Sequence, residues 1–454
     1  MQTRDEKTKL YRARWILPIE TGPVENGAVV LKGNKIADVG PAPELYAKFP
    51  ESLQEDFGEA VIMPGLINVH SHLELTIMRG YLEREEPDFF AWLRKLTIAK
   101  NERMTIDDLQ ASATFGAIEA ARAGVTCVGD ACDFGMAGIN ALRDVGLRGT
   151  VFQESFGPDP LLVIENFQKL RDKVSALREF ETELVRIGVS PHAPYTVCGQ
   201  QLEMISDYAL DESLPVMMHA AESEFEKEFI LEGCGPFAEG LQKRGIKWNA
   251  PKISTIQYLD QCGILETKPL LAHCINVDKR DIETIRMKGA SVAHCPKSNA
   301  KLGHGFAPFA DFIKSDLKAG LGSDSVASNN TCDIFEEARF ALLLSRAVNR
   351  NVLIKAEDVL RAATIGGARA LGLEKKIGSL VEGKEADLII VSLNDAHQQP
   401  VHDVIPSLIF AASGKDVRLT VIAGREVYRN GKVTTVDEDE IKARIAEIKN
   451  KLKA

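Results

Sequence analysis

Five histidine and aspartate side chains each follow an apolar, strand-like run, and this recurrence constrains the fold more than any other feature of the chain. The runs Val61–Val69, Leu214–Met218, Pro269–Ala272 and Ala319–Ser323 are followed by His70 with His72, His219, His273 and Asp324. In a parallel β/α barrel the carboxyl ends of the strands meet at one mouth, so residues far apart in sequence can surround one ion. The pattern therefore predicts a metal centre at the mouth of such a barrel.

The middle of the chain alternates apolar β runs with helical stretches, as expected for βα units. Eight candidate barrel strands can be assigned, and they cover Ile62–Val69, Val125–Asp130, Gly149–Glu154, Arg186–Ser190, Pro215–Met218, Pro269–Ala272, Ala290–His294 and Gly320–Ser323. The length of 454 residues fits one large α/β barrel plus an accessory domain.

Both ends of the chain read as short strands. Near the start, Asn26-Gly27 predicts a turn between the runs Trp15–Leu17 and Ala28–Gly33. Near the end, Gly and Asn turns separate three further runs, Asp387–Ser392, Val417–Ala423 and Glu426–Gly431. We therefore expect a (β/α)8 TIM-like barrel over residues 61–377, with a small β-sandwich domain built from residues 1–60 and 378–436.

The tail over residues 437–454 is predicted to be a helix. Its Ile441, Ile445, Ile448 and Leu452 fall on one helical face. This spacing favours a docking or subunit-contact helix.

Composition excludes several classes of protein. The net charge of −10, from 65 acidic and 55 basic residues, argues against a nucleic-acid partner. No apolar run approaches the roughly 18 residues that a membrane span needs, and the charged start Met1–Lys7 lacks the apolar core of a signal peptide. The eight cysteines contain no Cys-x-x-Cys pair, so neither a disulfide scaffold nor a thiolate zinc site is predicted. We expect a cytoplasmic protein.

The predicted ligands suit one class of cation. His70 and His72 stand two residues apart on a strand and share a face, so both can reach the same ion. For Asp324 the alternative is a helix N-cap or turn residue after Gly320 and Gly322. Imidazole and carboxylate groups together favour Zn²⁺, with Fe²⁺ or Mn²⁺ as other occupants.

Several motifs resemble those of the amidohydrolase superfamily, over essentially the whole chain. Met63-Pro-Gly-Leu-Ile-Asn-Val-His-Ser-His72 looks like its strand-one signature, and the stretch from Gly378 to Ile390 looks like its return into the β-domain. His219-Ala-Ala-Glu222, Leu271-Ala-His273 and the stretch from His294 to Gly303 are similar to the cytosine-deaminase-like branch, whose members deaminate nucleosides, bases and related heterocycles.

The resemblance implies a role for each site residue. His70, His72, His219 and Asp324 would hold one metal ion, and Asp324 would also move protons. Glu222 would be the proton shuttle, His273 would orient the attacking water, and His192 would contact substrate. A second metal is not expected, because binuclear relatives use a lysine near the fourth strand, where this chain has Val189-Ser-Pro-His192. Further pocket candidates are Trp92, Arg148, Ser298 and Asn299.

The chain departs from the adenosine-type deaminases of this branch after the first strand. Their Pro-x-Glu element, whose Glu binds the ribose hydroxyls, is missing from Phe90–Arg103. This stretch looks more like deaminases acting on aminodeoxyfutalosine. Basic residues within it would then pair with a substrate carboxylate, the candidates being Arg94, Lys95, Lys100 and Arg103. The alternative is a solvated helix face with Trp92 packed inward.

The resulting expectation is an aminohydrolase that removes an exocyclic amine from a purine-like nucleoside or other N-heterocycle, releasing ammonia. Aminodeoxyfutalosine or another adenosine derivative is the favoured substrate, and a homodimer the expected assembly. One alternative displaces chloride or an alkylamine from a triazine, or opens a cyclic amide, on the same site. Another is a non-catalytic scaffold, which is disfavoured because all of the expected metal ligands are present.

Overall fold

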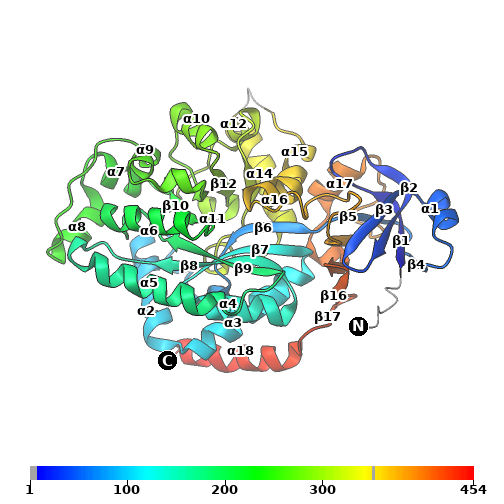
Figure 1. The fold of residues 1–454 in the computed structure, drawn as a ribbon, viewed down its shortest axis with the longest axis horizontal. Coiled ribbons are helices and arrows are strands. Elements are labelled where there is room, and N and C mark those ends of the chain that lie inside the picture. The colour runs from blue at the N-terminus through cyan, green and yellow to red at the C-terminus, as the bar shows by residue number, and fades with distance from the viewer. Residues whose placement is uncertain (1–7, 350–352, 454) are drawn as a thin grey trace.

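A closed barrel of parallel strands occupies the centre of the molecule (Figure 1). The computed structural model describes residues 8–349 and 353–453, so the charged start Met1–Lys7 lies outside the described residues. Within them, β6–β9 form one hydrogen-bonded set and β10–β13 another. Single bridges between Val189 and Val216 and between Ser71 and Asp324 join the two sets, which confirms the predicted TIM-like barrel.

The barrel strands match the predicted apolar runs in seven of eight cases. Their bounds are β6 Leu66–Ser71, β7 Val125–Cys132, β8 Arg148–Ser155, β9 Val185–Pro191, β10 Met217–Ala220, β11 Leu270–His273, β12 Ser291–His294 and β13 Ala319–Leu321. Every residue of β7 and β8 is buried, as expected for parallel strands that are covered on both faces.

The first predicted strand, Ile62–Val69, is in fact two strands. β5 (Ala60–Pro64) belongs to the small terminal sheet, and β6 begins the barrel after the single residue Gly65. A Cβ atom at Gly65 would lie 2.1 Å from the side chain of Thr126, so only glycine fits at this crossing. The apolar run is continuous because both strands are buried.

Helices cover the outside of the barrel and its carboxyl-terminal mouth. The longer ones are α2 Phe89–Ile98, α3 Ile106–Arg122, α4 Gly135–Val145, α5 Val163–Arg178, α6 Gly199–Asp211, α10 Lys279–Lys288 and α14 Ile334–Val348. The shorter ones are α7 Glu224–Leu231, α8 Gly235–Lys243, α9 Thr255–Gln261, α11 Pro296–Lys301, α12 Phe309–Lys314, α13 Val326–Asn329, α15 Ala356–Arg361 and α16 Gly367–Ala370. Capping boxes at Thr105, Ser254 and Asp278 fix where α3, α9 and α10 begin.

The terminal strands form one sheet, drawn in blue and orange at the right of Figure 1. Among the described residues its order is β17-β16-β15-β14-β5-β1-β2-β3, with β4 paired to β1. The bounds are β1 Lys9–Ile16, β2 Val24–Lys32, β3 Lys35–Pro41, β4 Leu53–Asp56, β14 Leu388–Ser392, β15 Val417–Ile422, β16 Arg425–Arg429 and β17 Lys432–Val433, with α1 Ala42–Lys48 and α17 Val404–Ala411 beside them. The predicted β-domain from both chain ends is confirmed.

One turn was placed wrongly. The first hairpin turns over residues 17–23, whereas Asn26 and Gly27 pair with β1 inside β2. Asn26 does have the left-handed backbone of a turn residue, with φ of 50°. The longer β2 continues through it, with Glu25 opposite Trp15 and Gly27 opposite Ala13, and this pairing overrides the local turn signal.

The tail forms α18 (Glu438–Lys453), as predicted, and lies along α3 (Figure 1). Ile448 and Leu452 are buried, whereas Arg444 and Lys451 both form ion pairs with Asp108 of α3. The helix therefore docks on its own chain.

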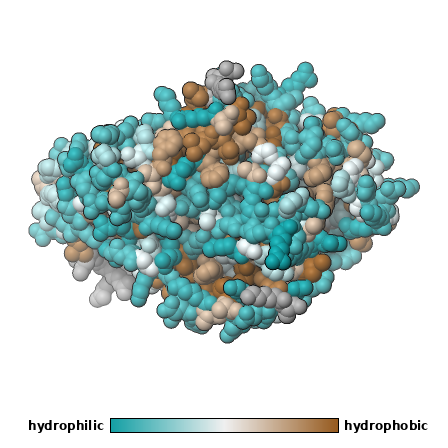
Figure 2. All heavy atoms as spheres, turned by 180° about the vertical axis from the view of Figure 1, so that it is seen from behind, coloured by the Kyte–Doolittle hydropathy of each residue, from teal (hydrophilic) through white to brown (hydrophobic). Residues whose placement is uncertain are grey.

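The outer surface is mostly hydrophilic on the face that Figure 2 shows, with hydrophobic areas toward its upper edge. Exposed aromatic and aliphatic side chains on α14 and α17 include Phe340, Leu343 and Phe410. Among the helices of the described residues, none is long and apolar enough to cross a membrane.

Candidate metal centre and active site

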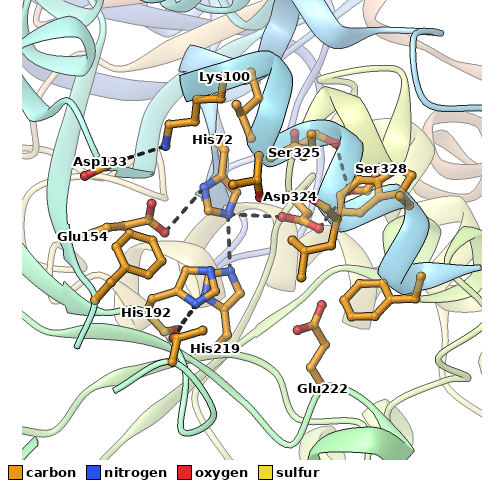
Figure 3. Close-up of a pocket in the computed structure, with 18 of the residues that line it drawn as sticks. His72, Lys100, Asp133, Glu154, His192, His219, Glu222, Asp324, Ser325 and Ser328 are labelled. Carbon is orange, nitrogen blue, oxygen red and sulfur yellow. Dashed lines mark hydrogen bonds and ion pairs between the residues drawn. The ribbon is translucent and has the colours of Figure 1, made fainter. Parts of the chain in front are cut away.

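The predicted ligands converge at the carboxyl ends of the barrel strands. One donor atom from each of His70, His219, His273 and Asp324 lies within 4.8 Å of every other. His72 adjoins this group, with its Nε2 3.3 Å from Nε2 of His219 and 3.5 Å from Oδ1 of Asp324 (Figure 3). Five side chains from four distant segments therefore meet at one point.

Partners on the far side of each ring orient the imidazoles. Nδ1 of His219 contacts the carbonyl of His192 at 2.8 Å, and Nδ1 of His70 contacts Sδ of Met217 at 3.1 Å. Nδ1 of His273 contacts Oδ1 of Asn299 at 2.8 Å. These contacts leave Nε2 of each ring for the centre of the group, as a metal site requires.

Asp324 is held by a dense polar network. Its Oδ2 accepts hydrogen bonds from Ser298 at 2.5 Å and Ser328 at 2.9 Å, while Oδ1 lies 3.3 Å from Nε2 of His70. Burial would raise the pKa of this carboxyl, but the adjacent ring of His70 and the other neighbouring imidazoles hold it well below its usual range. Its φ of 57° is a left-handed conformation that a non-glycine residue adopts only when its surroundings enforce it.

Two predicted substrate contacts are thus corrected. Ser298 donates to Asp324 and Asn299 contacts His273, so both side chains orient site residues and neither lines the pocket. They lie on α11, which directly follows strand β12 and brings them beneath the barrel mouth.

Glu222 lies beside the same group. Its Oε1 is 3.6 Å from Nε2 of His273, and the hydroxyl of Tyr195 donates to Oε2 at 3.3 Å. Burial would raise the pKa of Glu222, but His273, His304 and His219 outweigh it and lower that pKa. Burial would lower the pKa of His273, yet Glu222 and Asp324 raise it. The two groups favour each other's charged forms.

A pocket of about 510 Å³ opens above these residues. His72, His219, Glu222 and Asp324 form part of its lining, and the predicted substrate contacts His192 and Trp92 also line it. Its outer wall is largely apolar, with Phe89, Leu93, Leu96, Leu302 and Phe156 contributing. The volume suits a small organic ligand, and the polar groups gather at one end.

The prediction that Arg148 contacts substrate is wrong. Arg148 begins β8, so it sits at the opposite end of the barrel from the mouth. Its guanidinium pairs with Asp387 at 2.8 Å and with Glu385. Both acidic residues lie just before β14 of the terminal sheet. The residue is 2% exposed and ties the barrel to that sheet.

Only one of the basic residues predicted to meet a substrate carboxylate lines the pocket, namely Lys100. The chain continues from α2 into one π-helical turn over Ala99–Arg103, which carries Lys100 inward. Its ammonium already pairs with Glu74 at 2.7 Å. Lys95 pairs with Glu85, and Arg103 donates to the carbonyl of Leu452.

Glu154, Tyr195 and Arg244 line the pocket but did not figure among the predicted site residues. Glu154 ends the predicted strand Gly149–Glu154, so the rule that picked out the histidines applies to it equally. Tyr195 follows β9 by four residues and reaches Glu222. Arg244, at the end of α8, carries no comparable signal in the sequence.

The donor set fits a single divalent cation. Nε2 of His70 and Nε2 of His273 are buried without a hydrogen-bond partner among the described residues. Nitrogen atoms of His72 and His219 also face each other at 3.3 Å. Buried donor atoms of this kind are satisfied when a metal ion binds, and three imidazoles with one carboxylate suit zinc.

Comparison with known proteins agrees with this geometry. The sequence profile described as the amidohydrolase family matches residues 61–427. The chain is 34% identical over 430 residues to a 5-methylthioadenosine/S-adenosylhomocysteine deaminase of Syntrophobacter fumaroxidans, covering 94% of each chain. It superposes on a zinc-bound adenosine deaminase from Xanthomonas campestris with a TM-score of 0.86 and 27% identity, covering 98% of each.

A third likeness concerns the fold alone. The aminofutalosine deaminase of Helicobacter pylori, solved with methylthio-coformycin, superposes with a TM-score of 0.79 at 22% identity, covering 92% of this chain and all of that one.

Proposed function

The chain belongs to the amidohydrolase family, and we propose that it is a metal-dependent deaminase that removes the exocyclic amine of a purine-like nucleoside and releases ammonia. The observation that carries the proposal is the convergence of four imidazoles and Asp324 beside the buried carboxyl of Glu222. The full-length similarity to deaminases of adenine nucleosides supports this substrate class. An adenosine derivative such as 5′-methylthioadenosine, S-adenosylhomocysteine or aminodeoxyfutalosine is the proposed substrate.

We propose that His70, His72, His219 and Asp324 hold the ion. When bound there, a divalent cation supplies Lewis acidity that activates water near neutral pH. His273, fixed by Asn299, faces the same point through Nε2 and orients the water. Asp324, with one oxygen held by Ser298 and Ser328, takes the proton of that water.

Glu222 acts on the heterocycle. It lines the pocket beside the metal group, so its carboxylate can take the other proton of that water and pass it to the ring nitrogen next to the amine-bearing carbon. A carbon–oxygen bond forms at that carbon and the carbon–nitrogen bond breaks. The amine leaves as ammonia with the proton held by Asp324, and the oxygen stays on the carbon as a carbonyl. His192 lies on the pocket wall with Nδ1 bound to Thr196, which leaves Nε2 for the substrate.

An ammonia-release screen tests the proposal. Purified protein loaded with Zn²⁺ is assayed with adenosine, 5′-methylthioadenosine, S-adenosylhomocysteine, aminodeoxyfutalosine, guanine and cytosine, and metal per chain is measured in parallel. We expect release from at least one adenine nucleoside. Release from none of these by metal-loaded protein would contradict deamination, and turnover of a chlorotriazine or a cyclic amide would assign the site to those reactions instead.

We further propose a cytoplasmic homodimer. The exposed side chains of Phe340, Leu343 and Phe410 support a contact between proteins, because α14 and α17, which carry them, pack against each other. Light scattering on the purified chain tests the assembly, and a monomeric mass would contradict it.

A further inference from the structure

Glu154 is a buried pocket residue to which the proposed reaction gives no role. It stands near the end of β8, lines the pocket and is 5% exposed. In Figure 3 its carboxyl points toward His72, on the other side of the His72–His219 pair from Glu222. The residue therefore faces the site from the wall opposite the proposed proton shuttle.

The carboxyl of Glu154 has no hydrogen-bond donor within the described chain. Its Oε1 is buried and unpartnered, and the nearest ring nitrogen, Nδ1 of His72, is 3.9 Å away, which is too long for a hydrogen bond. Burying a carboxyl without a donor is costly, and a donor that arrives satisfies the unpartnered acceptor oxygen. The geometry calls for a donor that enters through the pocket.

Lys100 does not serve as that donor. Its ammonium lies 2.7 Å from Glu74 and 3.5 Å from Asp133, and no ion pair joins it to Glu154 within the part of the chain described. Three carboxyl groups thus surround one ammonium at this end of the pocket. An anionic group of a ligand would be repelled here, whereas a neutral hydroxyl is accommodated.

A second metal ion does not explain the residue either. One oxygen of Glu154 and ring nitrogens of His192 and His219 do lie within 4.8 Å of one another. His219, however, has Nδ1 on the carbonyl of His192 and directs Nε2 to the group around Asp324. A ring nitrogen has one lone pair, so His219 cannot serve two ions.

We propose that Glu154 is a specificity-determining residue that accepts a hydrogen bond from a sugar hydroxyl of the nucleoside. This inference rests on the proposed function, because a nucleoside places hydroxyl donors beside the heterocycle that reacts. His192 lies within reach of the same hydroxyls through Nε2. The apolar wall of Phe89, Leu93 and Leu96 then faces the substituent beyond the sugar.

The test compares adenosine with 2′-deoxyadenosine and 3′-deoxyadenosine. For the wild-type protein we expect kcat/KM to be about 10- to 100-fold lower for at least one deoxynucleoside than for adenosine, the usual effect of leaving a buried acceptor unsatisfied. Glu154→Ala should bring the ratio of kcat/KM for adenosine to kcat/KM for the deoxynucleoside close to one, by lowering kcat/KM for adenosine alone. Glu154→Gln keeps an acceptor oxygen and should retain part of the discrimination.

Two controls make the result specific. Glu165→Gln changes an exposed glutamate that pairs with Lys169 on α5, and it should keep the wild-type ratio. Metal per chain should stay unchanged in both Glu154 variants, because Glu154 is not among the proposed ligands.

Different outcomes overturn different claims. If wild-type protein releases no ammonia from any adenine nucleoside, the proposed function falls. If it deaminates adenosine and both deoxynucleosides equally well, or if Glu154→Ala keeps the wild-type ratio, the hydroxyl contact is wrong. Loss of metal from Glu154→Gln at an unchanged ratio would instead show that Glu154 only orients His72.

Discussion

Nε2 of His273 lies 3.6 Å from Oε1 of Glu222, and the opposite ring nitrogen of His273 is held by Asn299. The pair joins a side chain at the end of β11 to one that follows β10, so two neighbouring strands aim a base and an acid at the same point. His273 adopts a left-handed backbone with φ of 73° in doing so. Strain of this kind is typical of residues that the surrounding structure fixes for function.

Glu222→Gln should remove most turnover. The amide cannot pass a proton to the ring nitrogen, and loss of a positioned acid–base group lowers kcat by about 10²–10⁴-fold. Metal content, measured by mass spectrometry, should stay at the wild-type value. Glu224→Gln is the matched control, since Glu224 is exposed and pairs with Lys227. Equal kcat for the two variants would refute the role of Glu222.

Asn299→Leu should lower kcat by roughly 10- to 100-fold, the usual effect of removing the partner of a site histidine. KM and metal content should change little, because Asn299 does not line the pocket. Asn299→Asp restores an oxygen at the same place and should recover activity, and it should shift the pH profile because it adds a negative charge beside His273. If Asn299→Asp remains folded but recovers no activity, Asn299 does not act by positioning His273.

Removal of the metal should destabilise the fold as well as stop turnover. An ion that binds the folded state alone stabilises it by mass action, about 4 kcal/mol at a thousandfold excess over its Kd. We expect one equivalent of metal per chain, a lower Tm after chelation, and recovery of both Tm and activity with Zn²⁺. His219→Ala should bind less metal and show no shift in Tm on chelation. Two equivalents per wild-type chain would contradict a mononuclear site.

Arg148→Leu should act on stability and leave substrate binding unchanged. Removing one partner of a buried ion pair costs about 3–5 kcal/mol, because Asp387 would be left without its guanidinium. Chemical denaturation measures this loss, and KM for the best substrate should equal that of the wild type. A large increase in KM at unchanged stability would restore Arg148 as a substrate contact.

Glu426 should make stability depend on pH. Burial would raise its pKa, but hydrogen bonds from Arg429, Tyr11 and Lys9 outweigh burial and lower the pKa to about 2. A carboxyl whose pKa is lowered on folding stabilises the protein above its unfolded pKa, about 4.5, and loses this effect as pH falls toward 2.

Glu426→Gln should therefore cost about 1–2 kcal/mol at pH 7. The difference from wild type should shrink steadily below pH 4.5. A gap that stays constant between pH 7 and pH 3 would show that packing, and not charge, accounts for the loss.

Much of the barrel could be predicted because its parallel strands are buried on both faces and appear as unbroken apolar runs. For the same reason the boundary between β5 and β6 at Gly65 could not be predicted, since both strands are buried and no polar residue separates them. The positions of His219 and His273 followed from a simple rule, that a polar residue at the end of a barrel strand faces the mouth.

That rule also explains the misplaced Arg148 and the overlooked Glu154. Arg148 begins β8 and Glu154 lies near its end, so the first points toward the terminal sheet and the second toward the pocket. The roles of Ser298 and Asn299 depend on how α11 packs under the mouth, which is a tertiary contact with no local signature. Side chains that orient other side chains are the part of a site that sequence patterns describe least.

The crossing at Gly65 gives the molecule no hinge between its two parts. Four residues separate this glycine from His70, and β5 pairs with β1 on one side and with β14 on the other. Any twisting of the terminal sheet is transmitted directly to the first imidazole. A fragment beginning at the barrel would thus lose the anchor that aligns its reactive end, even though every ligand were still encoded in it.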